Sequence, residues 1–432
     1  MMRRKLTAEL HQWRSKSDRQ PLLLFGARQV GKTYTLREFG KTYPHMVYFN
    51  FETTPGLSQL FDGDIDPRRI VHLLEVQARD RIIPGQTLII LDEIQACERA
   101  VTSLKYFSEG APEFHIVAAG SLLGVAVNRQ EYSFPVGTVD SRYLHPLDFE
   151  EFLWAAGEEG LAGEIRTCFA HHEALPVALH HRALDHYRNY LVTGGMPAVL
   201  NVYFTEQSLI HVPEVQSQIL RGYVADMAKY TTAGEAVRVR AAFESIPAQL
   251  AKENRKFQYK IAQKGGTASS FGAAVAWLTY SGTVLKCQRV AHAVTPLAAH
   301  GDAAAFKLYL SDVGLLASLS GLPQAMLLAA DTMDNTFLGS VVENYVAQAL
   351  AANGVPLHYW TSPGKAEVDF VKQDQAQVRG LEVKKGSRTQ SKSLGVMMTR
   401  YHLEDSFRIS SKNFGKANGI ISVPLYSVFC ID

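Results

Sequence analysis

The run LLLFGARQVGKT, residues 22–33, joins an apolar segment to a glycine-bounded loop, and few folds use that combination. Its four leading apolar residues predict a buried strand at 22–25, and the following TYTLREF predicts a helix that ends at Gly40. The loop from Gly26 to Thr33 satisfies the pattern GxxxxGK[ST]. Glycines in such a loop let backbone N–H groups converge on phosphate oxygens, and the helix N-terminus favours their negative charge. A chance glycine turn is the alternative, but the order strand, loop, helix favours a nucleotide-phosphate site.

This loop supplies the candidate nucleotide contacts. Lys32 would reach the β- and γ-phosphates and the Thr33 hydroxyl would ligate Mg²⁺, so ATP and Mg²⁺ are the expected cofactors. The expected nucleotide-binding residues of the loop are Gly26, Ala27, Arg28, Gln29, Val30, Gly31, Lys32, Thr33 and Tyr34.

A second apolar run, TLIILDEIQ at 87–95, ends in two acids. Continuous apolar runs are typical of strands buried on both faces of a parallel sheet, and such sheets bind ligands beyond the strand C-termini. Asp92 would orient the Mg²⁺ shell, and Glu93 would polarise the attacking water, which makes Glu93 and Lys32 the catalytic candidates. The alternative is a strand that ends in solvated acids, and the preceding GKT loop argues against it.

Two more polar residues are candidates for the same site. Ser121 follows the apolar run HIVAAG and would sense the γ-phosphate or the water, or it is an ordinary turn serine. Arg142 would contact the γ-phosphate of its own site or of a neighbouring subunit, or it is a solvated surface arginine.

Strand candidates near 22–25, 46–51, 87–92, 115–119 and 141–145 are separated by helical stretches. This alternation predicts a five-stranded parallel sheet of the α/β class. Residues 1–150 are therefore expected to form an ATP-binding domain.

Composition restricts the class of protein further. The 432 residues predict two to four domains at about 150 residues each, and 44 Lys and Arg against 42 Asp and Glu give no global charge signal for nucleic acid. The four cysteines lie far apart, which disfavours a zinc site or disulfide framework and indicates a reducing cytoplasm. The first residues lack the apolar core of a signal peptide, and no window of about 18 residues is apolar throughout, so we expect no membrane span.

Residues 151–235 are expected to form a helical lid or linker. Two histidine pairs within it suggest a metal site, but Pro176 separates the pairs and no carboxylate has matching spacing, which favours a surface loop or helix face. These histidines are His171, His172, His180 and His181.

Residues 236–325 are expected to form a winged-helix-like module. It would contain a helix at 241–254, a strand at 257–261, a helix at 267–282 and a strand at 283–290. Its basic residues would contact nucleic-acid phosphates, or the module docks on the ATPase domain and its lysines are merely solvated. The basic residues are Lys252, Arg255, Lys256, Lys260 and Lys264.

Residues 335–432 contain a second candidate site. FLGSVVENYVAQALAANG predicts a helix at 337–354 with Glu343 beside its apolar stripe, and strands are expected at 357–362, 367–372 and 379–386. Asp369 lies on the middle strand, and Glu382 and Lys384 face one side of the last. Glu343, Asp369 and Glu382 would bind Mg²⁺, with Lys384 beside a nucleophilic water, so Asp369, Glu382 and Lys384 are catalytic candidates. A surface ion-pair cluster or an inactive relic is the alternative.

With these motifs the chain resembles bacterial and archaeal proteins that join an AAA-type ATPase domain to a C-terminal domain of unknown function with a restriction-endonuclease-like fold. The resemblance spans most of the chain and rests on GARQVGKT, LIILDEIQ, AAGSLLG, YLVTGGMPAVL, FKLYLSDVGLL, VVENYV, AEVDFV and LEVKKG. It implies a winged-helix linker and a PD-(D/E)xK-like module, in which Val368 replaces the proline. The implied ATPase residues are Lys32, Thr33, Asp92 and Glu93, and the implied nuclease-like residues are Glu343, Asp369, Glu382 and Lys384.

The expected protein is therefore a cytoplasmic Mg²⁺-dependent ATPase whose nucleotide state controls a nuclease-like domain that acts on DNA. The alternative is a non-cutting ATP-driven switch whose C-terminal domain docks a protein or a nucleic acid. Partner proteins and oligomerisation fit either hypothesis. The intact Glu382 and Lys384 favour cutting.

Overall fold

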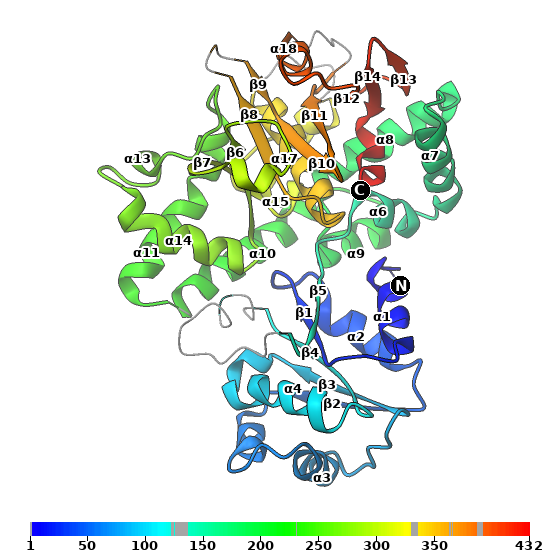
Figure 1. The fold of residues 1–432 in the computed structure, drawn as a ribbon, viewed down its shortest axis with the longest axis vertical. Helices are drawn as coiled ribbons and strands as arrows, with labels where there is room; N and C mark the ends of the chain where they lie inside the picture. The colour runs from blue at the N-terminus through cyan, green and yellow to red at the C-terminus, as the bar shows by residue number, and fades with distance from the viewer. Residues whose placement is uncertain are drawn as a thin grey trace. The chain divides into compact units, whose positions relative to one another are not determined.

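The computed structural model describes residues 2–121, 125, 137–229, 231–329, 336–362, 364, 366–386 and 392–432 (Figure 1). The chain divides into two compact units. The N-terminal unit is Arg3–His145 with Tyr280–Gly282, and the C-terminal unit contains Pro146–Thr279 and Thr283–Asp432.

The N-terminal unit is built on one sheet of five parallel strands in the order β2-β3-β4-β1-β5. The predicted five-stranded parallel sheet is thus confirmed. The strands are β1 (Leu22–Phe25), β2 (His45–Asn50), β3 (Thr87–Asp92), β4 (His115–Ala119) and β5 (Asp140–Tyr143). The helices are α1 (Leu6–Ser15), α2 (Lys32–Gly40), η1 (Pro55–Phe61), α3 (Pro67–Ala78), η2 (Ile94–Ala96) and α4 (Glu98–Gly110).

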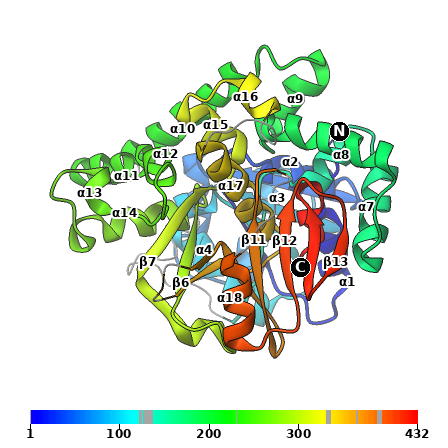
Figure 2. The same cartoon turned by 90° about the horizontal axis from the view of Figure 1, so that it is seen from above.

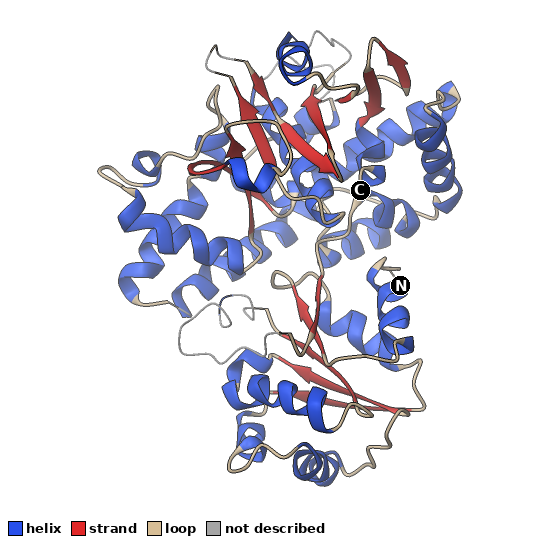
Figure 3. Cartoon of the chain, in the orientation of Figure 1, coloured by secondary structure: helices blue, strands red, loops and turns tan. Residues whose placement is uncertain are grey.

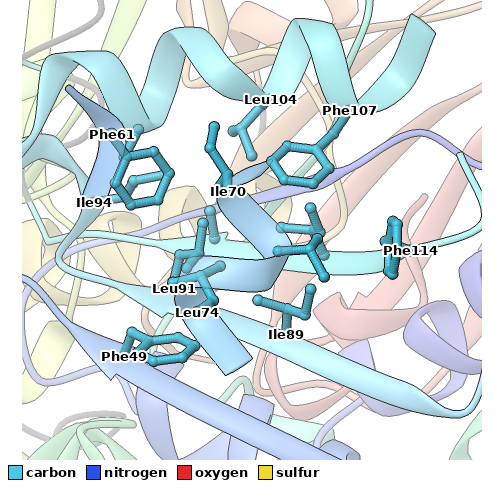
Figure 4. Packing of buried hydrophobic residues seen from close by; sticks show 14 of the residues in the cluster. Phe49, Phe61, Ile70, Leu74, Ile89, Leu91, Ile94, Leu104, Phe107 and Phe114 are labelled. Carbon is cyan, nitrogen blue, oxygen red and sulfur yellow. The ribbon is translucent and has the colours of Figure 1, made fainter. Parts of the chain in front are cut away.

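The apolar run of β3 is buried along its whole length, as its sequence predicts. On one face of the sheet, Ile89 and Leu91 pack in a cluster with Ile70 of α3 and Leu104 and Phe107 of α4 (Figure 4). Each such side chain contributes about 1.5–3 kcal/mol when it leaves water. This packing fixes β3 and so the positions of Asp92 at its end and of Glu93 directly after it.

Most of the chain between residues 146 and 280 is helical (Figure 3). These helices are α6 (Phe149–Ala155), α7 (Glu159–His171), α8 (Val177–Thr193), α9 (Pro197–Glu206), α10 (Val212–Lys229), α11 (Ala233–Glu244), α12 (Ile246–Leu250), α13 (Tyr259–Ala262) and α14 (Ala268–Tyr280). The later helices are η3 (Leu297–His300), α15 (Val313–Ser320), α16 (Gln324–Leu328), α17 (Thr336–Ala352), α18 (Lys392–Tyr401) and η4 (Leu425–Cys430).

Two mixed sheets complete the C-terminal unit. One has four strands in the order β7-β6-β8-β9, and the other has five in the order β10-β11-β12-β14-β13. Helix α17 packs against strands of both sheets (Figures 1 and 2), which explains why its polar residues are buried as well as its apolar ones. The strands are β6 (Val284–Val290), β7 (Gly301–Leu310), β8 (His358–Thr361), β9 (Glu367–Val368), β10 (Phe370–Asp374), β11 (Gln377–Val383), β12 (Ser406–Ser410), β13 (Gly415–Ala417) and β14 (Ile420–Pro424).

The strand predicted at 367–372 is interrupted at Asp369. Strand β9 before it pairs with β8, whereas β10 after it pairs with β11 of the other sheet. The chain therefore changes sheet at this aspartate, which places Asp369 where the two sheets meet.

Two glycines allow the turn between α8 and α9 to pack closely. A Cβ on Gly195 would lie 1.9 Å from the carbonyl oxygen of Leu147, and one on Gly194 would lie 2.0 Å from the carboxylate of Asp312. Asp312 is fully buried and accepts hydrogen bonds from the N–H groups of Gly195 (2.6 Å) and Leu315 (2.9 Å). The motifs YLVTGGMPAVL and FKLYLSDVGLL thus meet in one packed junction.

The predicted strand at 257–261 is wrong, because helix α13 occupies Tyr259–Ala262. The backbone of Gln258 is satisfied by a side chain: Gln249 donates to its carbonyl at 2.9 Å and accepts from its N–H at 3.0 Å. The helix predicted at 241–254 is two helices, α11 and α12, which meet at Ser245 two residues before Pro247. Proline lacks the N–H that a continuous helix needs.

Most residues of the ranges 151–235, 236–325 and 335–432 fall in one compact unit, whereas Tyr280–Gly282 belong to the N-terminal unit. The boundaries between the three ranges stay predictions. Strand β6, expected as a wing, pairs with β7 and also with β8 from the last of these ranges. Strand β7 was not among the predicted strands.

Candidate nucleotide site and a second polar cleft

The glycine loop lies between β1 and α2, as the sequence predicts. Gly26 has φ 143° and Gly31 has φ 97°, values that L side chains rarely adopt. A Cβ on Gly26 would also lie 2.3 Å from the carbonyl oxygen of Leu144. The motif glycines are therefore required by the backbone path, which brings the loop to the start of α2.

Lys32, the first residue of α2, lies with its side chain folded into the loop. Its Nζ donates to the carbonyl oxygens of Gly26 and Ala27, both at 2.8 Å. Burial lowers the pKa of Lys32 to about 8, although the negative charges of Glu93 and Asp92 oppose the shift. A buried ammonium held by two carbonyl oxygens is well suited to exchange them for an anion.

Asp92 joins the loop to β3. Its Oδ2 accepts hydrogen bonds from the Thr33 hydroxyl at 2.6 Å and from the Tyr48 hydroxyl at 2.7 Å. Its Oδ1 accepts from the N–H of Glu93 at 3.1 Å. A hydroxyl and a carboxylate in direct contact beside the loop are the oxygen ligands that Mg²⁺ prefers, so these residues fit that ion.

Glu93 follows β3 in the left-handed conformation, with φ 50°. Its Oε2 accepts hydrogen bonds from Gln95 Nε2 at 2.6 Å and from both the N–H and the hydroxyl of Ser121 at 3.2 Å. Strand β4 lies between β3 and β1, and Ser121, two residues after the end of β4, comes beside Glu93. The structure therefore brings the predicted Ser121 and Glu93 together.

Other candidate residues lie apart from this group or have other partners. Arg142 pairs with Glu9 of α1 at 2.9 Å and donates to the carbonyl oxygen of Ser141. The Tyr34 side chain is 47% exposed. Sequence reasoning missed Tyr48, whose hydroxyl contacts Asp92 and whose ring lies 3.9 Å from the Arg37 guanidinium.

A glycine loop between a parallel strand and a helix, with an Asp-Glu pair at the end of a second strand, is the arrangement of P-loop NTPases. Residues 18–153 match the AAA_14 family model, described as an AAA domain. Residues 184–326 match a domain of unknown function, DUF8612, and residues 338–426 match another, DUF4143. The comparison with curated proteins found no match.

Solved structures with similarity include the Walker-type ATPase PABY2304 of Pyrococcus abyssi, at 15% identity and a TM-score of 0.45, covering 74% of this chain and 96% of that one. The Aeropyrum pernix ORC2 protein is 12% identical with a TM-score of 0.36, and the match covers 78% of this chain and 92% of that one. The Aeropyrum pernix ORC1 protein in complex with DNA is 13% identical with a TM-score of 0.28, and the match covers 74% of this chain and 91% of that one. Because all three TM-scores lie below 0.5, no functional conclusion follows from them. In the described part of the chain, no helix is both long and apolar enough to cross a membrane.

The C-terminal unit contains a polar cleft of about 800 Å³. It brings Asp369, Glu382 and Lys384 together with Lys252 and Arg255, which belong to the predicted basic surface. The full lining is Lys252, Glu253, Asn254, Arg255, Gln258, Thr361, Ala366, Glu367, Asp369, Glu382, Lys384 and Ser393.

Glu382 is the most perturbed carboxyl of this cleft. Burial, followed by the neighbouring Asp369 charge, raises its pKa to about 7, while Lys384 opposes both effects. One carboxylate oxygen accepts from Lys384 Nζ at 2.6 Å, and the other, Oε2, is buried without a hydrogen-bond partner among the described residues. Asp369 Oδ2 accepts from the N–H of Val383 at 2.8 Å, which fixes it beside β11. A buried, unpaired oxygen next to a second carboxylate fits a bound cation.

Glu343, the third predicted metal ligand, is surrounded by donor side chains. Its side chain is 1% exposed and contacts three donors: Lys307 Nζ at 2.9 Å, the Tyr309 hydroxyl, and Arg255 Nη1. Among the described residues, no group of three His, Cys, Asp or Glu side chains is arranged to hold a metal ion. In this structure Glu343 pairs with Lys307 and Arg255, because α17 carries it between the two sheets.

One histidine of each predicted pair contacts a protein oxygen. His180 Nδ1 lies 2.8 Å from the Tyr426 hydroxyl, and His171 Nδ1 lies 2.8 Å from the carbonyl oxygen of Thr167. Two cleft-associated residues that sequence reasoning missed are Lys307 and Glu367, which pair at 2.7 Å. Lys307 lies in the motif FKLYLSDVGLL. A lysine among apolar strand-forming residues was the sequence signal for a buried, paired charge.

Proposed function

We propose that the N-terminal unit binds and hydrolyses ATP with Mg²⁺. The observation that supports this most is the contact between the Thr33 hydroxyl and Asp92 Oδ2 at 2.6 Å, with Glu93 held in place at the end of the same strand. Thr33 and Asp92 would hold Mg²⁺, which neutralises developing phosphoryl charge when it is bound.

Three side chains would bind the phosphates and position the attacking water. Lys32 exchanges two carbonyl oxygens for β- and γ-phosphate oxygens, and its charge is then stabilised by a full anion. Glu93 accepts a hydrogen bond from the attacking water and orients it in line with the γ-phosphate. Ser121, which donates to Glu93, holds that carboxylate in position.

Two substitutions test this proposal. Lys32→Ala should abolish ATP hydrolysis and weaken nucleotide binding, whereas Lys41→Ala, an exposed lysine just after the same helix, should leave both unchanged. Glu93→Gln should keep ATP bound but slow its cleavage by at least about 100-fold. Equal rates of ATP hydrolysis in wild type and Lys32→Ala would show that this loop takes no part in the reaction.

We propose secondly that the cleft of the C-terminal unit is a nuclease-like site for DNA, under the control of the nucleotide state of the same chain. Asp369 and Glu382 would hold Mg²⁺, and Lys384 would place its amine beside the attacking water. The unpaired, buried Oε2 of Glu382 supports this reading. The competing proposal is a non-cutting switch in which the cleft docks a protein or nucleic acid.

A nuclease assay distinguishes the two. Single- and double-stranded DNA and RNA are incubated with Mg²⁺ or Mn²⁺, with and without ATP, beside Asp369→Ala and the control Glu404→Ala, an exposed acid outside the cleft. Cleavage that is lost in Asp369→Ala and kept in Glu404→Ala supports the nuclease. A dependence of cleavage on ATP supports control by the nucleotide state. Intact ATP hydrolysis without cleavage of any substrate favours the switch.

A further inference from the structure

Arg255 reaches the cleft from a segment far away in the sequence. It lies in the loop after α12, in the left-handed conformation with φ 47°. Its Nε donates to the hydroxyl of Ser340 on α17 at 3.0 Å, and its Nη1 contacts Glu343. The same Nη1 lies 3.9 Å from Asp369 Oδ1. Three contacts thus hold one guanidinium between the buried core and the cleft.

Glu343 is stabilised without Arg255. Lys307, whose side chain is 0% exposed, and the Tyr309 hydroxyl both donate to its Oε1. Arg255 is therefore an additional cation whose second neighbour, Asp369, is a cleft carboxylate. Such a cation reduces the negative potential that a metal ion would meet at Asp369.

The formal charges of the described residues lead to the same expectation. The carboxylates Glu343, Glu367, Asp369 and Glu382 outnumber the cations Arg255, Lys307 and Lys384 by one. Without Arg255 the difference becomes two, and the lost charge is the one beside Asp369, which lines the same cleft as the unpaired Glu382 oxygen.

We propose that Arg255 is an internal counter-cation that competes with a divalent metal ion for the Asp369–Glu382 pair and holds the cleft in a low-affinity state. This inference rests on the proposed metal site in the cleft. Arg255 acts here as an autoinhibitory contact. A guanidinium suits this role because it is always charged and binds the hydroxyl of Ser340 and a carboxylate at once.

The test measures Mn²⁺ binding to the full-length chain without nucleotide, by the loss of the free Mn²⁺ signal in electron paramagnetic resonance. Arg255→Gln should bind Mn²⁺ at least about tenfold more tightly than wild type, equivalent to ~1.4 kcal/mol. Lys252→Gln removes the same charge from the rim of the same cleft and should change the affinity by less than about twofold. Arg255→Gln/Asp369→Asn should lose the gain.

Thermal unfolding of each variant shows whether it is folded, and Arg255→Lys serves as the second variant if Arg255→Gln unfolds. Lysine keeps the charge but lacks the several donors of the planar guanidinium, so Arg255→Lys should raise the affinity for Mn²⁺ less than Arg255→Gln does. If Mn²⁺ binds wild type and Arg255→Gln equally and Asp369→Asn abolishes binding, the metal site stands and the role of Arg255 is refuted. If the gain survives Asp369→Asn, or if no variant binds Mn²⁺, the inference is also refuted, and in the second case the metal site falls with it.

Discussion

Replacement of Lys307 by methionine tests whether Glu343 is a buried counter-ion. Lys307 Nζ lies 2.9 Å from Glu343 and 2.7 Å from Glu367, and the ammonium is 4.9 Å from the centre of the Tyr359 ring. The side chains of Lys307 and Glu343 are 0% and 1% exposed, so solvent cannot replace the lost partner. Methionine has nearly the same length, which keeps the packing of β7.

The expected cost follows from this burial. Removal of one partner of a buried ion pair typically costs about 3–5 kcal/mol, because the remaining charge is left uncompensated. Arg255 and Tyr309 still contact Glu343 in the variant, and Glu367 is 28% exposed and can be hydrated. We therefore expect the lower end, about 3 kcal/mol of unfolding free energy.

Urea unfolding followed by tryptophan fluorescence measures this cost, since Trp154, Trp277 and Trp360 all lie in the C-terminal unit. Hydrogen exchange of the α17 amides localises it. The double variant Lys307→Met/Glu343→Gln should cost at least about 1.5 kcal/mol less than the sum of the two single variants. A cost below about 1 kcal/mol for Lys307→Met, or strictly additive costs, would contradict a coupled buried pair.

Three further predictions address single contacts. Tyr48→Phe removes a donor to Asp92; nucleotide binding without Mg²⁺ should stay the same, and the Mg²⁺ needed for half-maximal hydrolysis should rise roughly tenfold in a rate titration. Burial lowers the pKa of His115 from 6.5 to about 4. As the pH falls, the unfolded chain therefore takes up a proton at this histidine before the folded chain does. The unfolding free energy of the N-terminal unit should drop by up to about 3 kcal/mol as the pH falls from 6.5 to about 4. His115→Gln keeps a partner for the Tyr43 hydroxyl, and urea titrations at about pH 7 and about pH 4.5 should show a smaller loss in this variant. Gly195→Ala places a Cβ 1.9 Å from a backbone carbonyl oxygen and should lower the unfolding free energy by about 3 kcal/mol, as thermal unfolding would show.

The nucleotide site was largely predictable because its parts are local or follow continuous apolar strands. Lys32 bonds to Gly26 only six positions earlier, and the GKT loop alone determines that geometry. Asp92 is 59 positions from Thr33, but both follow from the rule that parallel strands present their C-termini at one edge. Tyr48 was not predicted, because nothing in its own strand distinguishes it from a packing tyrosine.

The C-terminal cleft could be predicted only in part. The helix with Glu343 and the strand with Glu382 were found, because periodicity is a local property. The pairing of β6 with β8 was not, since it joins segments 70 positions apart, as in the pair Gln288 and His358. The change of sheet at Asp369 also has no local signal, because the residues on both sides of it read as one apolar strand.

The two sites differ in the origin of their cations, and this difference decides what sequence motifs can establish. At the nucleotide loop the lysine is part of the motif, so the motif predicts both the anion site and its charge. At the cleft, the carboxylates belong to short motifs, but Arg255 and Lys307 come from segments 85 and 36 positions away from their partners Ser340 and Glu343. Those distant cations determine whether Glu343 is a metal ligand or a counter-ion. A carboxylate pattern alone therefore predicts where a metal site could form, whereas its charge balance has to be read from the folded chain.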